Sequence, residues 1–411
     1  MKKILCIALV LVMILGSFAA CATKSGTDET TDPAASPAAS TAPESTSGDT
    51  IKIGTVGCYT GEYAQYGLGV RNGATLYIDQ LNANGGINGK QVELIAYDNK
   101  ADNQEAINAF NRMVDEGITA LIGDVLTGNT IAVVGAAYPL NMPMITASAT
   151  AASVTFDDET NTLYSNVFRT CFIDPFQGEK MAQYAAEKLN AKTAGIIYET
   201  GNDYAVGLKD AFTTKCAELG IEIVSEQGYA KGDMDFKSQL TTIAAKKPDV
   251  LFCPNYYEND GLIISQARGV GLEATVLGGD GMSGVTGYGT PEDLEGTIYC
   301  SGYAPGSTDA VKAFEEAYTA KYGKETLNMF AATAYDAAMV MCNAIAVAEE
   351  AGLTAGTDEY KQAVIDAIRD NSGELEGVTS KGYTFDEHNN PVKDAVIMKV
   401  VNGVETFVEI F

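Results

Sequence analysis

Two successive series of alternating strand and helix patterns constrain this chain more than any other feature. In the first series, short β-rich apolar runs alternate with helical patterns. The runs lie at 51–57, 92–97, 120–122 and 144–147, and the helical patterns lie at 67–81, 104–115 and 129–138. In the first of these helices, apolar residues from Val70 to Leu81 recur at helical spacing and predict a buried face. Such alternation predicts a parallel sheet covered by helices, with right-handed crossovers.

A second series begins near residues 171–175. It alternates predicted helices at 176–189, 204–219, 236–245 and 260–268 with predicted strands at 194–198, 222–227, 250–254 and 275–277. The last part is more helical, with patterns at 310–322, 331–348 and 359–369 before a hairpin, 396–401 and 405–410, that turns at Asn402-Gly403. The 361 residues from Ile51 onward exceed the size at which one core keeps growing. We therefore expect an α/β protein with two lobes.

The first 20 residues have the layout of a secretory signal peptide. Two lysines precede an apolar run, Ile4 to Leu15, that is too short to span a bilayer comfortably, and small residues follow it. The segment Phe18-Ala19-Ala20-Cys21 resembles a lipoprotein signal-peptidase site, so we expect Cys21 to be acylated and to become the new amino terminus. The alternative is ordinary cleavage with Cys21 incidental. The abrupt change in composition after Cys21 favours the lipoprotein.

Residues 21–50 predict a flexible tether rich in Ala, Ser, Thr and Pro. Between Ala22 and Asp49 there is no aromatic and no branched aliphatic side chain. Such a segment cannot bury enough apolar surface to offset the entropy of ordering it. We therefore expect folding to begin near Ile51.

The chain is strongly acidic, with 27 Lys and Arg against 54 Asp and Glu. Removal of Lys2 and Lys3 with the signal leaves 25 against 54, a charge of −29. This balance argues against a nucleic-acid partner and against basic patches that bind anionic lipid headgroups. Beyond Cys6 and Cys21, the cysteines are Cys58, Cys171, Cys216, Cys253, Cys300 and Cys342. They show no CxxC pair and no zinc-site spacing, so we expect most of them to be small core residues and leave their disulfide pairing open.

Polar residues gather just after the predicted strands, at the sheet edge where ligands of open parallel sheets bind. These segments are 58–61, 124–130, 148–150, 255–257 and 278–281. An enzyme would need a nucleophile, a base or a metal there. The only histidine, His388, lies in a predicted hairpin turn far from this cluster, which makes a Ser-His-Asp hydrolase improbable. A hydrolase that uses paired carboxylates stays open, with Asp98, Asp124 or Asp280 as candidates.

Several segments, in this order, resemble the leucine/isoleucine/valine-binding proteins of branched-chain amino-acid ABC importers. They are IKIGTVGCYTGEYAQYG (51–67), NGATLYIDQLNANGGINGK (72–90), ALIGDVLTGNT (120–130), MPMITASAT (142–150), FKSQLTTIAAKKPDVLFCPNYYE (236–258) and SQARGVGLEATVLGGDG (265–281). The resemblance covers nearly all of 51–411. It implies the type I periplasmic-binding fold, two Rossmann-like lobes with parallel sheets joined by three crossing strands.

The resemblance also implies discontinuous lobes with a ligand cleft between them. The three crossings should lie near Ile173, Tyr303 and Phe385. Lobe 1 would then comprise 51–173 with 303–384, and lobe 2 would comprise 174–302 with 385–411.

In the first lobe, Thr127, Ser148 and Thr150 match the family positions that hold the ligand α-carboxylate, and Tyr66 matches the tyrosine that flanks the ligand. The chemistry agrees, because a carboxylate favours several hydroxyl and N–H donors, and Thr127 stands at the predicted start of a helix. Ser148 and Thr150 could also serve as a helix cap, a role that is compatible with binding.

In the second lobe, Asp280 matches the acid that binds the ligand ammonium, and Tyr204 and Tyr256 match aromatic wall positions. Other members carry glutamate where this chain has the shorter Asp280, and the match of Tyr204 requires a one-residue shift. As alternatives, Gly-Gly-Asp-Gly at 278–281 could be only a turn, and the three tyrosines could be packing residues.

The resemblance implies an extracytoplasmic lipoprotein that captures a branched-chain or other small neutral amino acid and delivers it to an ABC permease. We expect no catalytic residue, no cofactor and no metal, and a monomer held to the cell membrane by its lipid. A ligand-sensing subunit that docks on a membrane signalling receptor is the alternative that the sequence does not separate from this.

Overall fold

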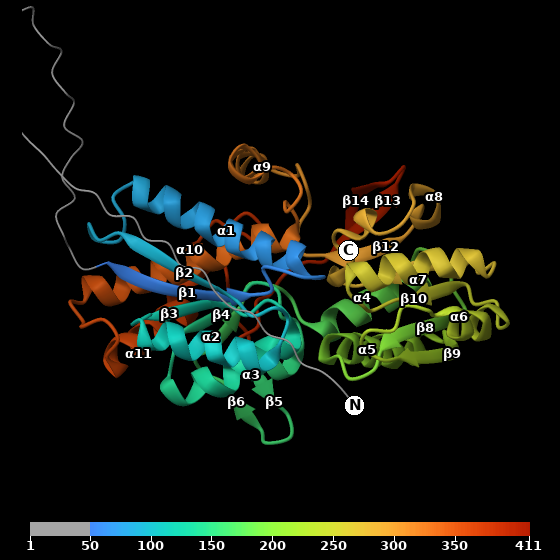
Figure 1. Cartoon of the computed structure of the whole chain (residues 1–411), viewed down its shortest axis with the longest axis horizontal. Coiled ribbons are helices and arrows are strands. Elements are labelled where there is room, and N and C mark those ends of the chain that lie inside the picture. Colours follow the sequence, from blue (N-terminus) through green and yellow to red (C-terminus); the bar gives the residue numbers. More distant parts are fainter. Residues whose placement is uncertain (1–49) are drawn as a thin grey trace, which may run out of the picture. The chain divides into compact units, whose positions relative to one another are not determined.

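Two β-sheets, each flanked by helices, organise the described part of the chain (Figure 1). The computed structural model describes residues 50–411. The predicted signal peptide (1–20), the lipidation site Cys21 and the predicted tether, apart from its last residue Thr50, lie outside the described residues.

The first sheet is wholly parallel and has the strand order β2-β1-β3-β4-β7. Its strands are β1 (Ile51–Gly57), β2 (Val92–Asp98), β3 (Ala120–Gly123), β4 (Met144–Thr146) and β7 (Val167–Arg169). The helices associated with it are α1 (Ala64–Ala83), α2 (Asn103–Asp115), α3 (Thr127–Ala137), α9 (Asp309–Tyr322), α10 (Met329–Glu350) and α11 (Asp358–Asn371). We call this sheet with its helices the first lobe. A small hairpin, β5 (Phe156–Asp157) and β6 (Thr162–Leu163), lies between β4 and β7 in the sequence.

The second sheet has the order β14-β13-β12-β11-β10-β8-β9 and is parallel except for its last two strands. Its strands are β8 (Thr193–Glu199), β9 (Glu222–Tyr229), β10 (Val250–Phe252), β11 (Thr275–Gly278), β12 (Ile298–Ser301), β13 (Val396–Val401) and β14 (Val404–Ile410). Its helices are α4 (Asp174–Glu187), α5 (Asp203–Leu219), α6 (Lys237–Ala244), α7 (Tyr257–Gly269) and the short α8 (Pro291–Leu294). We call this part the second lobe.

The alternating pattern predicted the order of these elements, and every predicted helix or strand end lies within three residues of the observed one. The predicted hairpin is also present, and β13 adds antiparallel to β12 at the edge of the second sheet. The strands β5, β6, β7 and β12 and the helix α8 were not predicted. The sheets divide the strands at 51–169 and 193–410, while the lobe bounds and the three crossing points stay a prediction.

Helix α10 is the centre of the first lobe. It is the one described helix that is long and apolar enough to cross a bilayer, but 78% of its most apolar window is buried inside the fold, as in a core helix. It packs closely against α1, because Gly73 lies so near Ala331 that an added Cβ would stand 2.0 Å from the Ala331 carbonyl oxygen. The two helices can therefore approach this closely only because residue 73 is a glycine and has no side chain.

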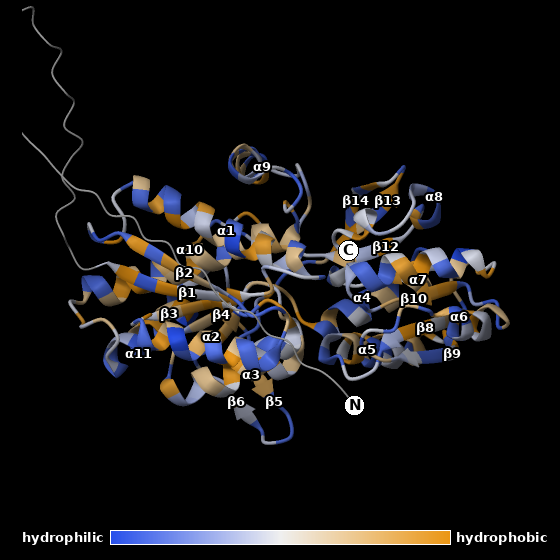
Figure 2. Ribbon diagram, viewed as in Figure 1, coloured by the Kyte–Doolittle hydropathy of each residue, from blue (hydrophilic) through white to orange (hydrophobic). Residues whose placement is uncertain are grey.

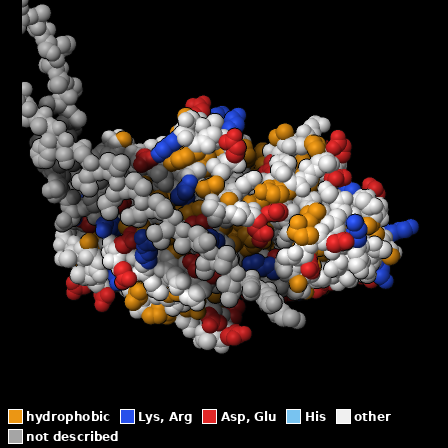
Figure 3. Space-filling model, in the orientation of Figure 1, with side chains coloured by type: hydrophobic (Ala, Val, Ile, Leu, Met, Phe, Trp, Pro, Cys, Tyr) orange, Lys and Arg blue, Asp and Glu red, His pale blue; other side chains and the backbone are white. Residues whose placement is uncertain are grey.

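Apolar strands form the interior and polar residues cover it (Figure 2). On the face drawn in Figure 3, acidic and basic side chains are interspersed. The six cysteines within residues 50–411 are buried thiols, and no disulfide joins them. This confirms that they are core residues.

Candidate functional site

A cavity lies where the strand ends of the two sheets meet, and it brings together six of the seven residues predicted to bind ligand. It is lined by Tyr66, Val125, Leu126, Thr127, Ser148, Tyr204, Tyr256, Asp280, Gly281 and Phe330. The polar members follow β3, β4, β10 and β11, and so occupy the carboxyl edges of both sheets. This is the position at which open parallel sheets bind ligands. The seventh residue, Thr150, is fully buried beside Thr127.

The first-lobe side of the cavity presents the start of helix α3. Thr127 is the first residue of α3, and the first bond within the helix runs from the Thr130 amide to the Leu126 carbonyl at 2.8 Å. The amides of the first turn thus precede the hydrogen-bonded ladder and point outward from the helix end. Together with the helix dipole they favour a negatively charged group beside Thr127.

Ser148 and Thr150 differ in what their hydroxyl groups can offer. The Ser148 hydroxyl donates to the Val125 carbonyl at 2.7 Å, which fixes the loop that follows β3. The Thr150 amide lies 3.4 Å from the Thr127 Oγ1, and the buried Thr150 hydroxyl, beside the Asp174 carboxylate, makes no hydrogen bond of ordinary geometry within residues 50–411. A buried hydroxyl without such a bond is costly, so Thr150 is suited to a further polar contact.

The second-lobe side presents the carboxylate of Asp280. Gln177 Nε2 donates to Asp280 Oδ1 at 3.1 Å, and the Asp280 amide donates to Gln177 Oε1 at 2.8 Å, which fixes the orientation of the acid. Asp280 Oδ2 is buried and has no hydrogen-bond partner in the described chain. Burial raises the pKa of Asp280 from 3.8 to about 7. A buried carboxylate with an open oxygen favours a cationic partner.

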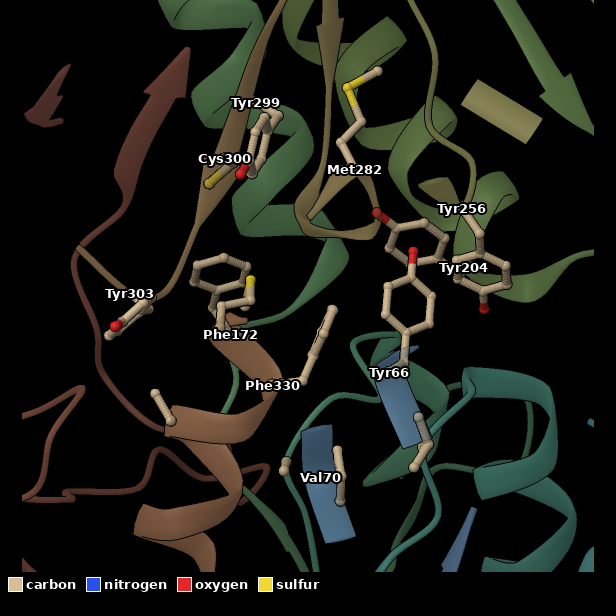
Figure 4. Close-up of a cluster of buried hydrophobic side chains, with 14 of the residues drawn as sticks. Tyr66, Val70, Phe172, Tyr204, Tyr256, Met282, Tyr299, Cys300, Tyr303 and Phe330 are labelled. Carbon is tan, nitrogen blue, oxygen red and sulfur yellow. The ribbon is translucent and has the colours of Figure 1, made fainter. Parts of the chain in front are cut away.

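Aromatic side chains form the wall between these two polar sides. Tyr204 and Tyr256 stack with centroids 5.1 Å apart, and the Tyr204 hydroxyl accepts from the Gly281 amide at 2.8 Å. Tyr66 rises from α1 toward them, and Phe330 contacts its edge at 4.8 Å between centroids (Figure 4). The cavity is therefore apolar in its middle and polar at two opposed sides.

Asp174, at the start of α4, is a candidate that sequence reasoning missed. It is fully buried, the Thr150 hydroxyl lies beside its carboxylate without a hydrogen bond of ordinary geometry, and its amide donates to the Thr150 carbonyl at 2.9 Å. Burial raises its pKa well above the ordinary value. In the sequence, Asp174-Pro175 resembles an ordinary helix start, so nothing in the pattern distinguished it. Phe330 was missed as well, because it comes from α10, far along the chain.

Of the residues considered for hydrolysis, Asp280 lines the cavity and the others lie elsewhere. His388 stacks on Phe156 at the β5–β6 hairpin, with centroids 3.9 Å apart. Asp98 accepts hydrogen bonds from the amides of Tyr59 and Lys100, both at 2.9 Å, and buried Asp124 accepts one from Asn99 Nδ2 at 2.5 Å. Neither lines the cavity, and residues 50–411 contain no group of three or more His, Cys, Asp or Glu that could hold a metal ion.

Residues 50–405 match the family model described as periplasmic binding protein. The chain belongs to this family. It is 32% identical to a Leu/Ile/Val-binding protein of Rhizobium johnstonii over 78% of this chain and 83% of that protein.

Two solved structures agree with the fold. The leucine-binding protein LivK of Thermotoga maritima aligns with a TM-score of 0.79 and 31% identity, covering 88% of this chain and 99% of that one. The substrate-binding protein LivJ of a branched-chain amino-acid transporter from Streptococcus pneumoniae, solved in complex with isoleucine, aligns with a TM-score of 0.77 and 33% identity over the same shares.

These findings confirm the predicted family and the type I periplasmic-binding fold. The protein is a substrate-binding protein and not an enzyme, which removes the carboxylate hydrolase from consideration. Family membership also implies a location outside the cytoplasm.

Proposed function

We propose that this protein captures a branched-chain or other small neutral amino acid between its lobes and delivers it to an ABC permease. Anchored by a lipid on Cys21, it would act as a monomer at the outer face of the cell membrane. The proposed ligand contacts are Tyr66, Thr127, Ser148, Thr150, Tyr204, Tyr256 and Asp280.

The observation that carries the proposal is the polarity of the cavity. An amino acid is a zwitterion, so it needs an anion site and a cation site a few ångströms apart. The start of α3, with Thr127, supplies N–H and O–H donors for a carboxylate. The open oxygen of Asp280 is suited to the ammonium. Both line one cavity, from opposite lobes.

The apolar lining supports a hydrocarbon side chain in the ligand. Val125, Leu126 and Phe330 line the cavity together with the tyrosine rings. Burial of a leucine or isoleucine side chain against such a lining contributes about 1.5–3 kcal/mol. The names of the relatives, which refer to leucine, isoleucine and valine, agree with this choice.

Capture would work by shifting the population of open and closed forms. A ligand that touches one lobe gains nothing from closure, whereas one that contacts both α3 and Asp280 binds the closed form better. The permease would then recognise the closed form.

The identity of the ligand is tested by a thermal-shift screen of the twenty common amino acids, followed by calorimetry on those that raise the melting temperature. We expect leucine, isoleucine or valine to give the largest shifts. A protein that none of the twenty stabilises would contradict the proposal.

The anchor and the partner need separate tests. Radiolabelled palmitate should label the parent chain in growing cells and should not label a Cys21→Ser variant. Crosslinking and pull-down from membranes should recover a permease. Recovery of a signalling receptor instead would favour the sensory alternative.

A further inference from the structure

Two tyrosine hydroxyls form hydrogen bonds between the lobes beside the cavity. Tyr66, on α1 of the first lobe, donates to the carbonyl of Gly281 and accepts a hydrogen bond from the amide of Tyr257 at 3.1 Å. In return Tyr257, the first residue of α7 in the second lobe, donates to the carbonyl of Glu62 at 2.5 Å. The main chain of each lobe is thus bonded to a phenol of the other.

These hydroxyls are shielded from water in this arrangement. Tyr66 is 2% exposed and Tyr257 is fully buried, and their rings meet edge to face with centroids 4.6 Å apart. Burial raises the pKa of both phenols, so each stays a protonated donor at any physiological pH.

A side chain of the first lobe also lies close to the backbone of the second lobe here. Gly284, which has a φ of +99°, lies so near Gln65 that an added Cβ would stand 2.8 Å from the Gln65 side-chain oxygen. Glu405 Oε1 accepts from the Gly284 amide at 2.9 Å and holds this loop in place. The start of α1 therefore rests on a fixed surface of the second lobe.

We propose that Tyr66 and Tyr257 form a clasp that stabilises the closed form itself, and that the clasp raises affinity for every ligand by the same factor. The inference rests on the proposed function for its ligand and adds to it. The Tyr66 ring lines the cavity, but the Tyr66 hydroxyl is hydrogen-bonded to the backbone of the second lobe. The clasp residues are therefore positioning residues, which act through closure rather than through a ligand functional group.

The physical basis is the dependence of apparent affinity on the binding-competent fraction. When the lobes separate, each clasp hydroxyl exchanges a protein partner for water, so the net effect of one neutral hydrogen bond is modest. Loss of one such bond should lower the ratio of closed to open molecules about fivefold. Where the open form predominates without ligand, Kd rises by that same factor.

The test compares Tyr66→Phe, Tyr257→Phe and the double variant with the parent chain. Tyr318→Phe is the matched control, because the fully buried Tyr318 hydroxyl also donates to a backbone carbonyl, that of Thr326 at 2.9 Å, without joining the two lobes. Calorimetry gives Kd for leucine, isoleucine and valine. Single-molecule FRET, with one fluorophore on each lobe, gives the closed fraction without ligand.

We expect Tyr257→Phe, which removes one interlobe hydrogen bond, to raise Kd about fivefold, and Tyr66→Phe, which removes two, to raise it more. Each rise should be equal for the three ligands, with faster dissociation and a matching fall in the ratio of closed to open molecules, and Tyr318→Phe should have no effect. A change confined to one ligand, an equal change in the control, or parent-like values would overturn the clasp. If the parent binds none of the three amino acids, the proposed function fails, and the clasp is then decided by FRET alone: an unchanged closed fraction in the double variant overturns it.

Discussion

Asp280 is the residue on which the proposed recognition of an ammonium depends most directly, because it lines the cavity and its buried Oδ2 atom makes no hydrogen bond of ordinary geometry within residues 50–411. Replacing Asp280 with Ala should weaken amino-acid binding by about 1.5–3 kcal/mol, the value of one charge-assisted hydrogen bond, or roughly tenfold to a hundredfold in Kd. Thr150→Ala, which removes the buried hydroxyl, should weaken binding by a similar factor. Calorimetry with the best ligand measures both. Asp210→Ala, an exposed acid of the same lobe, serves as the control, and parent-like Kd values in both site variants would refute the site.

Burial of Asp280 also predicts how binding depends on pH. Its pKa of about 7 means that the acid is largely protonated below neutral pH in the ligand-free protein. An ammonium requires the ionised form, so binding should release a proton, and affinity should fall by up to about tenfold for each pH unit below 7. Calorimetry in two buffers of different ionisation enthalpy counts the protons.

Stability should move in the opposite sense with pH. The pKa of Asp280 in the folded protein lies above its ordinary value of 3.8. The stability that this raised pKa contributes to the folded protein is therefore fully present below pH 3.8 and is lost as the pH rises through 7. Asp280→Asn should remove this part of the pH dependence of unfolding. In the binding experiment, proton release that persists in the Asp280→Asn variant would assign the release to another group, and Asp174 would then be examined first.

At the scale of elements, the contact between α1 and α10 gives a clear pair of substitutions. Gly73→Ala places a methyl group 2.0 Å from the Ala331 carbonyl oxygen, so the helices must separate, at a cost of about 1–3 kcal/mol. Gly135→Ala, within α3, meets no atom within 4 Å and should stabilise by about 0.5–1 kcal/mol through helix propensity. Urea unfolding measures both. Equal effects of the two substitutions would mean that helix packing does not restrict position 73.

The elements that sequence reasoning predicted carry either a helical period or an apolar run between turn signals. Helices such as α1 and α5 carry several turns of apolar residues, and the predicted strands β4 and β10 are short, mostly apolar runs. The missed strands are short: β5 and β6 have two residues each, β7 has three, including a buried Arg169, and β12 has four. A run of that length has no measurable alternation, and only pairing with a neighbouring strand defines it.

The candidate site was predicted where it follows a strand directly. Topology alone brings the segments 124–130, 148–150 and 278–281, which follow β3, β4 and β11, to the sheet edges, and the family resemblance selected Thr127, Ser148 and Asp280 within them. Asp174 was not found, and Tyr257 was found only as part of the segment 255–257 and not as a contact to Glu62, because their environments depend on which surfaces of the two lobes meet. That information lies in no local pattern.

At the scale of the whole molecule, capture requires one ligand to contact both lobes. Leucine and 4-methylpentanoate share a carboxylate and a hydrocarbon chain, but the second lacks the ammonium and therefore lacks a partner for Asp280. If leucine is the ligand, it should stabilise the folded protein by about 2.7 kcal/mol at a hundred times its Kd and should shift the FRET signal toward closure. The analogue should bind at least tenfold more weakly and leave the lobes as they are without ligand. Closure driven equally by the analogue would mean that the anion site alone closes the cleft and that Asp280 has no part in the coupling.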